Sequence, residues 1–227
     1  MIIERSMHPD WLSNAYLVGD RPGGTAVFVD SGAPLEPLLQ AVEEQALTPT
    51  HLLLTHSHHD HTAGNESLRR RFGLELIERA GAPFQTGELT VETLETPGHS
   101  ADSRSFVING SACFSGDTLF AGSVGGSSAG FAELRHSIMD VLLVLPPETR
   151  LLPGHSGETS VGEEWERNPF VRLWRGLDSE GEETCRVAGR EARLVLWASD
   201  YDGGFKAWVR FEDGSDRIVG GSGVDRN

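Results

Sequence analysis

The chain has 227 residues, a formal net charge of −15 and 38% hydrophobic residues. This length provides for one full domain and a small additional one, and no stretch approaches the roughly 20 consecutive apolar residues of a membrane span. The negative charge disfavours nucleic acid and anionic membranes as partners, because clustered Lys and Arg bind phosphate groups. Cys113 and Cys185 lie far apart and the N-terminus lacks the apolar run of a secretory signal, so we expect a reduced, cytoplasmic protein.

Strands and helices are predicted to alternate from the N-terminus onward. Residues 14–19 and 25–30 are apolar runs separated by an Arg-Pro-Gly-Gly turn, which is typical of paired strands. Residues 34–46 carry leucines and a valine at helical spacing, and an apolar strand follows them at residues 52–55. A second helix is predicted over residues 64–72.

The same alternation continues in the second half of the chain. The further predicted elements are strands at residues 73–78, 89–95, 104–108, 111–115 and 149–152 and a helix at residues 131–145. Strands and helices that alternate in two halves indicate a layered α/β domain.

The C-terminal part differs in composition from the rest. Two apolar runs, residues 193–198 and 205–211, flank an Asp-Tyr-Asp-Gly-Gly turn, and this pattern predicts a β-hairpin. A further strand is predicted at residues 217–220. We therefore expect a main domain over residues 1–172 and a small antiparallel β module over residues 173–227. Its aromatic side chains are expected to pack the core of the module, with a ligand-binding face as the alternative.

A cluster of metal-ligand side chains directly follows the strand at residues 52–55, in the run HSHHDH. In extended backbone, side chains two residues apart point the same way, so His56 and His58 can converge on one metal ion. Asp60 and His61 can turn toward a second ion. Imidazole and carboxylate groups are ligands for zinc and for non-haem iron or manganese.

Three single residues elsewhere in the chain complete this set. His99, Asp117 and His155 each follow a short apolar or extended run and lie beside Gly or Pro. Each is therefore a candidate ligand at a strand end or on a tight loop.

These four segments together resemble the metallo-β-lactamase superfamily of hydrolases. The matching motifs are THSHHDH at residues 55–61, PGHS at 97–100, GDTLF at 116–120 and PGH at 153–155. The resemblance covers about residues 1–172. It implies a four-layered αβ/βα sandwich with the site between its two halves.

The resemblance also implies two divalent metal ions, with zinc expected and iron or manganese as alternatives. The ligands divide into three residues for each ion and one bridging residue, namely His56, His58 and His99 for the first ion, Asp60, His61 and His155 for the second, and Asp117 as the bridge. Asp30 would orient one of the His ligands, because a ligating imidazole needs a hydrogen-bond acceptor on its other nitrogen.

Within the superfamily, the sequence is most similar to short glyoxalase II-like proteins, which hydrolyse thioesters of the hydroxyacylglutathione type. Residues 116–125 and 153–159, followed by Asn-Pro-Phe at 168–170, carry this similarity. Relatives usually have a basic residue just after the first of these segments, where this chain has Gly-Ser-Ser at 126–128. The cationic contact to a substrate carboxylate is therefore not expected here.

The similarity implies hydrolysis of a small acyl-thiol conjugate by a hydroxide held between two metal ions, with Asp60 accepting a proton as that hydroxide forms. Three alternatives stay open from the sequence. A persulfide dioxygenase shares this fold but uses one iron, held by residues matching His56, His99 and Asp117. A lactone or phosphodiester hydrolase of the same superfamily shares the metal ligands. The module over residues 173–227 could instead serve a non-enzymatic role, such as formation of a homodimer or docking of a partner.

Overall fold

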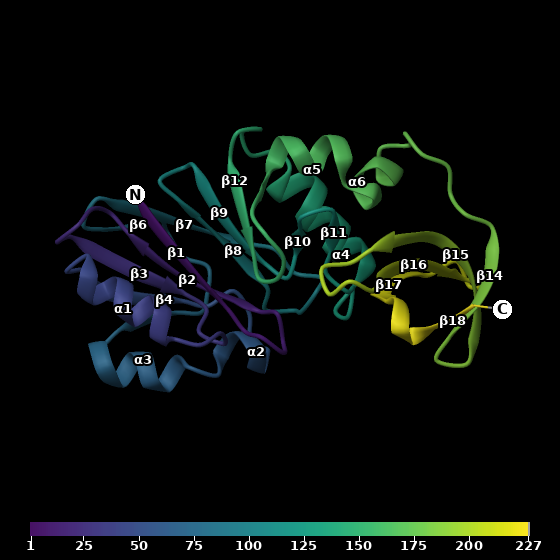
Figure 1. The fold of residues 1–227 in the computed structure, drawn as a ribbon. Coiled ribbons are helices and arrows are strands. Elements are labelled where there is room, and N and C mark those ends of the chain that lie inside the picture. The colour runs from purple at the N-terminus through teal and green to yellow at the C-terminus, as the bar shows by residue number, and fades with distance from the viewer. Residues whose placement is uncertain (227) are drawn as a thin grey trace.

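The computed structural model describes residues 1–226, and its first sheet lies at the N-terminal end of the molecule (Figure 1). This sheet has the strand order β1-β2-β3-β4-β5 and consists of β1 (Ile2–Met7), β2 (Asn14–Gly19), β3 (Thr25–Val29), β4 (Thr48–Leu53) and β5 (Glu75–Ile77). Helices α1 (Glu36–Glu44) and α3 (Asn65–Phe72) cover one face of the sheet (Figure 1). Their apolar sides pack Leu38 and Leu68 against Phe28 of the sheet.

A second sheet has the strand order β13-β12-β9-β8-β7-β6. Its strands are β6 (Phe84–Thr86), β7 (Leu89–Glu95), β8 (Arg104–Ile108), β9 (Ala112–Gly116), β12 (Arg150–Pro153) and β13 (Thr159–Ser160). Helices on its outer side are α4 (Phe131–His136) with the π-helical turn η1 (Ser137–Leu142), α5 (Val161–Arg167) and α6 (Pro169–Trp174). The side chain of Asn168 caps α6 by accepting hydrogen bonds from the backbone N–H groups of Phe170 and Val171.

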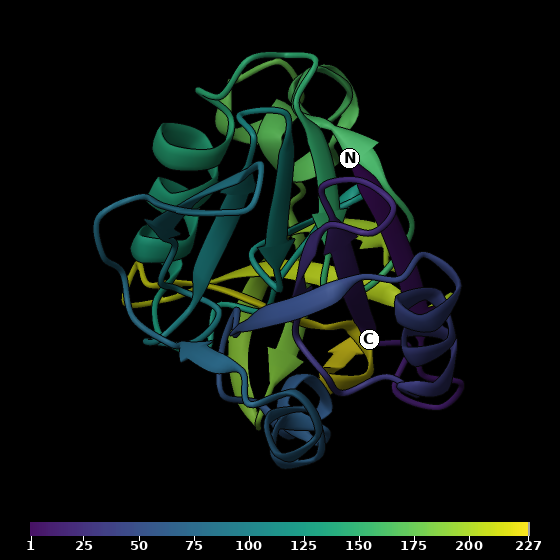
Figure 2. The same ribbon diagram turned by 90° about the vertical axis from the view of Figure 1, so that its left-hand side faces the viewer.

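The two sheets pack face to face and form the central layers of the molecule. Tyr16 and Val27 of the first sheet share a buried apolar cluster with Phe106 and Phe114 of the second. Figure 2 shows the strands between α1 and α3 on one side and α4 on the other. The order of layers is therefore helix, sheet, sheet, helix, which confirms the predicted layered α/β architecture.

A third, antiparallel sheet lies at the opposite end of the molecule from β3 and α1 (Figure 1). Its strand order is β17-β16-β15-β14-β18, with strands β14 (Glu183–Val187), β15 (Arg190–Ser199), β16 (Phe205–Phe211), β17 (Asp216–Gly220) and β18 (Val224–Arg226) and a 3-10 turn, η2 (Gly221–Gly223). On one face of the third sheet, Leu194 and Val209 belong to an apolar cluster formed by residues of this sheet alone. The other face adds Trp208 and Ile218 to the core around Leu134 of α4. The predicted hairpin and third strand are thus confirmed.

Most of the other predicted elements are also present, and strands β2, β7 and β8 have the predicted bounds. The helix predicted over residues 131–145 is wrong at its C-terminal end, because the regular helix passes into η1, which ends at Leu142 ahead of two prolines. Strand β1 was not predicted, since Glu4 and Arg5 interrupt its apolar residues. Both lie on the exposed edge strand of the first sheet.

Three short elements lie near the ends of the central strands. They are the helical turn α2 (His59–Thr62) and the two-stranded ribbon of β10 (Leu119–Phe120) and β11 (Ser123–Val124). Within residues 1–226, no helix has both the length and the apolar character needed to cross a membrane.

Candidate metal centre

The run HSHHDH lies between β4 and α3. Its first residues are extended and its last ones are helical, and the two conformations direct the side chains differently. His56 follows β4 and is fully buried, and His58 is the extended residue that precedes α2. The helical turn of α2 then brings Asp60 and His61 round toward the same region. The sequence predicted this turn toward a second ligand group, but not that it would be helical.

The other three candidate ligands lie on loops that follow strands of the second sheet. His99 follows β7, Asp117 follows β9 and His155 follows β12. Strands β9 and β12 are parallel neighbours, so Asp117 and His155 emerge at the same edge of the sheet. The structure thereby brings together all seven residues that the sequence singled out.

The ligand atoms form groups of three, each within 4.8 Å of one another. These groups are His56 with His58 and His99, His56 with His61 and Asp117, and Asp60 with His61 and His155. In the first group, Nδ1 of His58 lies 3.0 Å from Nε2 of His56 and 3.1 Å from Nε2 of His99. Three ring nitrogens therefore face a common point.

The carboxylate of Asp117 lies between the two outer groups. Its Oδ2 atom is 3.5 Å from Nε2 of His99 and 3.3 Å from Nε2 of His155, and its Oδ1 atom is 3.3 Å from Nε2 of His61. Nε2 of His56 is 4.0 Å from the same carboxylate. Asp117 is thus positioned to contact ions held by either group.

The donor set fits divalent metal ions. Nε2 of His61 and Oδ1 of Asp117 are buried and make no hydrogen bond within residues 1–226. Buried polar atoms without partners are costly, so their presence in the middle of the cluster indicates that another group satisfies them. Imidazole and carboxylate donors suit zinc, iron and manganese.

Hydrogen bonds behind the cluster fix which ring nitrogens face inward. Nδ1 of His61 donates to Oδ2 of Asp30 at 2.8 Å, and Nδ1 of His99 donates to the carbonyl oxygen of Gly126 at 3.2 Å. The hydroxyl of Thr55 donates to Asp30 at 2.7 Å and lies 3.1 Å from Nδ1 of His56. Nε2 of these three imidazoles, His56, His61 and His99, is thereby left free for a metal ion. The predicted role of Asp30 beside a His ligand is matched by this contact.

Charges in the cluster shift several pKa values. Burial opposes the charged form of His61, but the carboxylates of Asp117 and Asp30 outweigh burial and raise its pKa well above the usual value. Burial also opposes the charge on His155, but hydrogen bonds to Asp117 and Asp60 raise its pKa to about 9. The pKa of His56 is lowered to about 4, chiefly by burial. Without metal, the protons therefore reside on the His61 and His155 side.

Glycines let the loops approach one another closely at this site. A Cβ atom on Gly154 would lie 2.3 Å from Oδ1 of Asp117 and 2.7 Å from Cε1 of His61. A Cβ atom on Gly32 would lie 1.6 Å from the carbonyl oxygen of Asp60. Only glycine leaves room for the ligands at these two positions.

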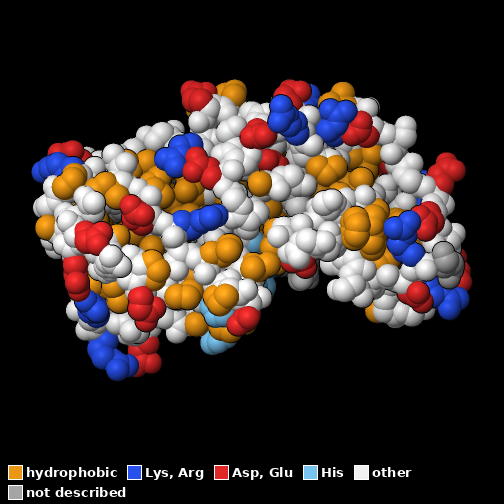
Figure 3. Space-filling view, in the orientation of Figure 1, with side chains coloured by type: hydrophobic (Ala, Val, Ile, Leu, Met, Phe, Trp, Pro, Cys, Tyr) orange, Lys and Arg blue, Asp and Glu red, His pale blue; other side chains and the backbone are white. Residues whose placement is uncertain are grey.

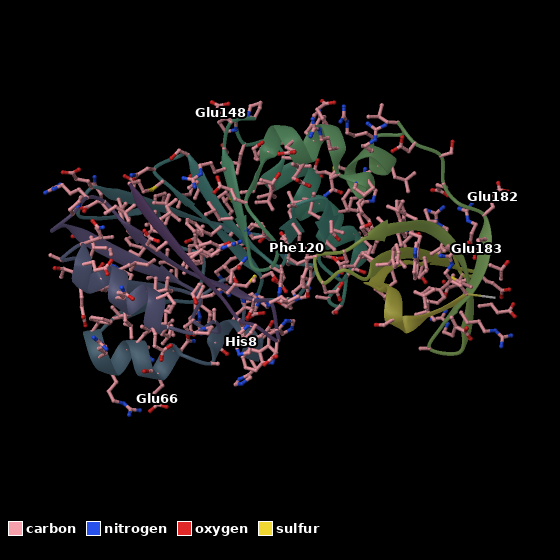
Figure 4. All side chains as sticks on the ribbon, in the orientation of Figure 1. His8, Glu66, Phe120, Glu148, Glu182 and Glu183 are labelled. Carbon is pink, nitrogen blue, oxygen red and sulfur yellow. The ribbon has the colours of Figure 1, made fainter. Side chains whose placement is uncertain are left out.

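The third sheet contributes one residue that the sequence analysis did not identify as part of the site. Tyr201, in the turn between β15 and β16, stacks on the ring of His155 with centroids 4.4 Å apart and an interplanar angle of 19°. It also meets the edge of Phe120 at 5.1 Å, and Phe120 lies near the middle of the molecule in Figure 4. Burial raises the pKa of the Tyr201 phenol, and the carboxylate of Asp117 adds to this. The sequence feature that could have indicated Tyr201 is an aromatic residue placed in a Gly-containing turn.

The mouth of the cluster carries further aromatic side chains. His59 is exposed and turns away from the ligands, with its ring against Trp11 at 5.3 Å. Trp11 in turn stacks on His8 at 4.1 Å, which Figure 4 places near α2. In Figure 3, histidine side chains lie beside a hollow on the lower side of the molecule. The hollow separates the part that contains the first sheet from the part that contains the third sheet.

The sequence and the fold are similar to those of several known proteins. A family model described as the metallo-beta-lactamase superfamily matches residues 8–84. A probable metallo-hydrolase of Bacillus subtilis is 32% identical over 70% of this chain and 92% of its own length. A hydroxyacylglutathione hydrolase of Rhodospirillum rubrum is 33% identical over 62% of this chain and 60% of its own length. The crystal structure of ETHE1 from Myxococcus xanthus is 33% identical with a TM-score of 0.67, over 75% of this chain and 84% of that one.

Proposed function

Because the chain belongs to the metallo-beta-lactamase superfamily and has its fold, we propose that it is a metal-dependent hydrolase that cleaves the thioester bond of a small acyl-thiol conjugate. The observation that carries this proposal is the position of Asp117 between two groups of three ligands. We propose residues 1–172 as the catalytic domain and residues 173–227 as a separate β module.

In this proposal, the residues of the cluster would hold two divalent ions, with zinc as the expected metal. His56, His58 and His99 would hold the first ion, Asp60, His61 and His155 would hold the second, and Asp117 would contribute to both. Bound ions of this kind lower the pKa of water and polarise a carbonyl oxygen.

Asp60 is suited to accept a proton in this reaction. Burial opposes its charge, but a hydrogen bond from His155 and the proximity of His61 outweigh burial and lower its pKa. The carboxylate is therefore ionised at neutral pH. It is also the most exposed of the carboxylates around the cluster, with 30% of its side chain accessible against 9% for Asp117 and 3% for Asp30. Asp60 is thus both charged and more open to solvent than the other two carboxylates.

The thioester class is supported by the similarity to hydroxyacylglutathione hydrolase. The chemistry of the site agrees with it, because a thiolate leaves readily and needs no strong general acid. Asp30 and Thr55 serve the reaction indirectly, since they hold His61 and His56 in the orientation that points Nε2 inward.

The proposed hydrolysis is tested with protein stripped by a chelator and then reloaded with zinc. Acyl thioesters of several thiols are supplied, and the thiol released is measured. We expect turnover in the reloaded protein and none in the stripped protein or in His56→Ala, whose circular dichroism stays that of the wild type. Retained turnover in the stripped protein would refute a metal-dependent mechanism.

Persulfide dioxygenation is a second candidate, favoured by the 33% identity to ETHE1. His56, His99 and Asp117 would hold a single iron, and Asp117 lies within 4.0 Å of both imidazoles. Oxygen uptake by the iron-loaded protein with glutathione persulfide, in the absence of thioester hydrolysis, would establish this activity in place of the first.

A further inference from the structure

The turn between β15 and β16 forms a wall of the metal centre, although it lies in the third sheet. Tyr201 at its tip covers the outer face of His155 with nearly parallel rings. The same ring contacts Phe120 of β10, so that the tip is packed between a metal ligand and the central core. Three segments that are distant in the sequence, around Phe120, His155 and Tyr201, thereby meet at one face of the cluster.

A buried ion pair anchors this turn. Nζ of Lys206 lies 2.9 Å from Oδ2 of Asp200, and their side chains are only 9% and 5% exposed. Oδ1 of Asp200 accepts a hydrogen bond from the hydroxyl of Ser123 in β11 at 2.9 Å. Lys206 is the one Lys of the chain, and its ammonium group lies 5.6 Å from the centre of the Tyr201 ring. The position of Tyr201 is therefore fixed by contacts on both sides of the turn.

The sheet behind the turn is also joined to the loop that follows β11. The backbone N–H of Ser127 donates to the carbonyl oxygen of Ile218 at 3.0 Å, and the N–H of Ile218 donates to the hydroxyl of Ser127 at 2.8 Å. His99 donates to Gly126 in the same loop. The third sheet thus contacts the metal centre at two places, through Tyr201 and through the loop that holds His99.

The hydroxyl of Tyr201 makes no hydrogen bond to any group within residues 1–226. Its ring is partly exposed, while one face is covered by His155. The Tyr201 ring stacks on His155, with 4.4 Å between the ring centroids, so the residue lies beside the place where a substrate would react. It offers a neutral donor with no partner of its own.

Resting on the proposed thioesterase function, we propose that Tyr201 is a specificity-determining residue, whose hydroxyl binds the thiol part of the substrate and selects an uncharged one. The negative charge around the turn favours an uncharged thiol over one that carries a carboxylate. Asp200 and Asp202 flank Tyr201, and the ammonium group of Lys206 is taken up by Asp200. With a net charge of −15 overall, the turn offers no free cation to a carboxylate on the thiol.

The test compares wild type, Tyr201→Phe and Phe205→Ala, each loaded with zinc. Phe205 lies at the other end of the same turn, is 46% exposed and stacks on Trp197, so its loss serves as a matched control away from the metal centre. Acetyl thioesters of N-acetylcysteamine and of glutathione serve as the uncharged and the charged substrate. Binding of S-propyl-N-acetylcysteamine, a thioether that cannot be hydrolysed, is measured separately by calorimetry.

We expect the wild type to have a higher kcat/KM for the N-acetylcysteamine ester than for the glutathione ester. Tyr201→Phe should raise KM and the Kd of the thioether about three- to tenfold, as expected for one lost hydrogen bond, with kcat and metal content unchanged. Phe205→Ala should match the wild type in all four quantities.

Two results would overturn the proposal for Tyr201. One is an unchanged Kd and KM in Tyr201→Phe, and the other is a wild-type preference for the glutathione ester. If neither ester is hydrolysed by the wild type, the thioesterase function fails. The calorimetric titration then still decides whether Tyr201 contacts an uncharged thioether.

Discussion

Asp30 supports His61 from behind the metal centre, with 2.8 Å between Oδ2 of Asp30 and Nδ1 of His61 and both side chains buried. The other carboxylate oxygen of Asp30 accepts from the backbone N–H of Thr55 at 2.8 Å. Asp30 has a positive φ of 55°, a conformation that Asn tolerates as well as Asp. One residue therefore fixes the orientation of His61 and of the segment that leads to His56.

Asp30→Asn should weaken metal binding by about 10- to 100-fold, the usual effect of losing a hydrogen-bond partner behind a ligand. Asparagine keeps the backbone conformation but loses the negative charge that holds the proton on Nδ1 of His61. Zinc affinity is measured by competition with a chromogenic chelator. Asp140→Asn is the matched control, because Asp140 pairs with His136 at 3.0 Å on the exposed surface. Equal affinities in the two variants would contradict the role given to Asp30.

Gly154→Ala should reduce the metal content of the protein while leaving it folded. The new methyl group would overlap the side chains of Asp117 and His61, which must then move apart. Gly157→Ala is the control, since a Cβ atom there would meet nothing within 4 Å. Both variants are compared by metal analysis and circular dichroism. A full metal content in Gly154→Ala would show that the site is less tightly packed than described.

Metal binding should release protons and strengthen as pH rises toward 9. In the metal-free protein the pKa of His155 is about 9, above its ordinary value of 6.5. Its protonation therefore stabilises the metal-free fold fully below about pH 6.5, and this contribution is lost as pH rises through 9. An imidazole must be neutral to bind a metal ion, so at pH 7.5 the ion has to displace this proton from His155.

Calorimetry of zinc binding at pH 7.5, in two buffers with different ionisation enthalpies, measures the protons released. We expect at least one proton per chain, because His61 also has a raised pKa. Binding without proton release, or affinity that falls between pH 6.5 and 9, would contradict the charge distribution described.

Lys206→Met should destabilise the protein by about 3–5 kcal/mol, the usual cost of leaving a buried carboxylate without its partner. Asp200 would keep only the hydrogen bond from Ser123. Arg150→Met is the control, because its partner Glu158 is 45% exposed, and the loss of an exposed pair costs about 0–1 kcal/mol. The free energy of unfolding is measured by urea titration. Similar losses in both variants would show that the Lys206 pair is not a special anchor.

Much of this fold could be predicted because its strands carry continuous apolar runs and its helices carry clear spacing. Strand β2 is buried along its whole length, which its sequence of small and apolar residues indicates. Strand β1 escaped prediction because Glu4 and Arg5 are exposed at the edge of the sheet, so its pattern is only half apolar. The helical turn α2 was missed because the ligands within it give no apolar spacing to detect.

The candidate site also contains residues that could be predicted from the sequence and one that could not. The seven candidate ligands could be predicted because each residue type and its place after a strand indicate metal chemistry. Tyr201 could not, because the sequence does not tell which way a separate β module packs. Its contact with His155 depends on the Lys206 ion pair and on the core shared by Trp208 and α4.

A centre with two ions, one on either side of Asp117, predicts the metal content of the protein, which can be measured per chain. Protein is purified without added metal, its metals are measured, and the same sample is assayed for thioester hydrolysis and for persulfide-dependent oxygen uptake. We expect about two divalent ions per chain, as the two ligand groups imply, together with hydrolysis. One iron per chain with oxygen uptake and no hydrolysis would rule out a two-ion hydrolytic centre.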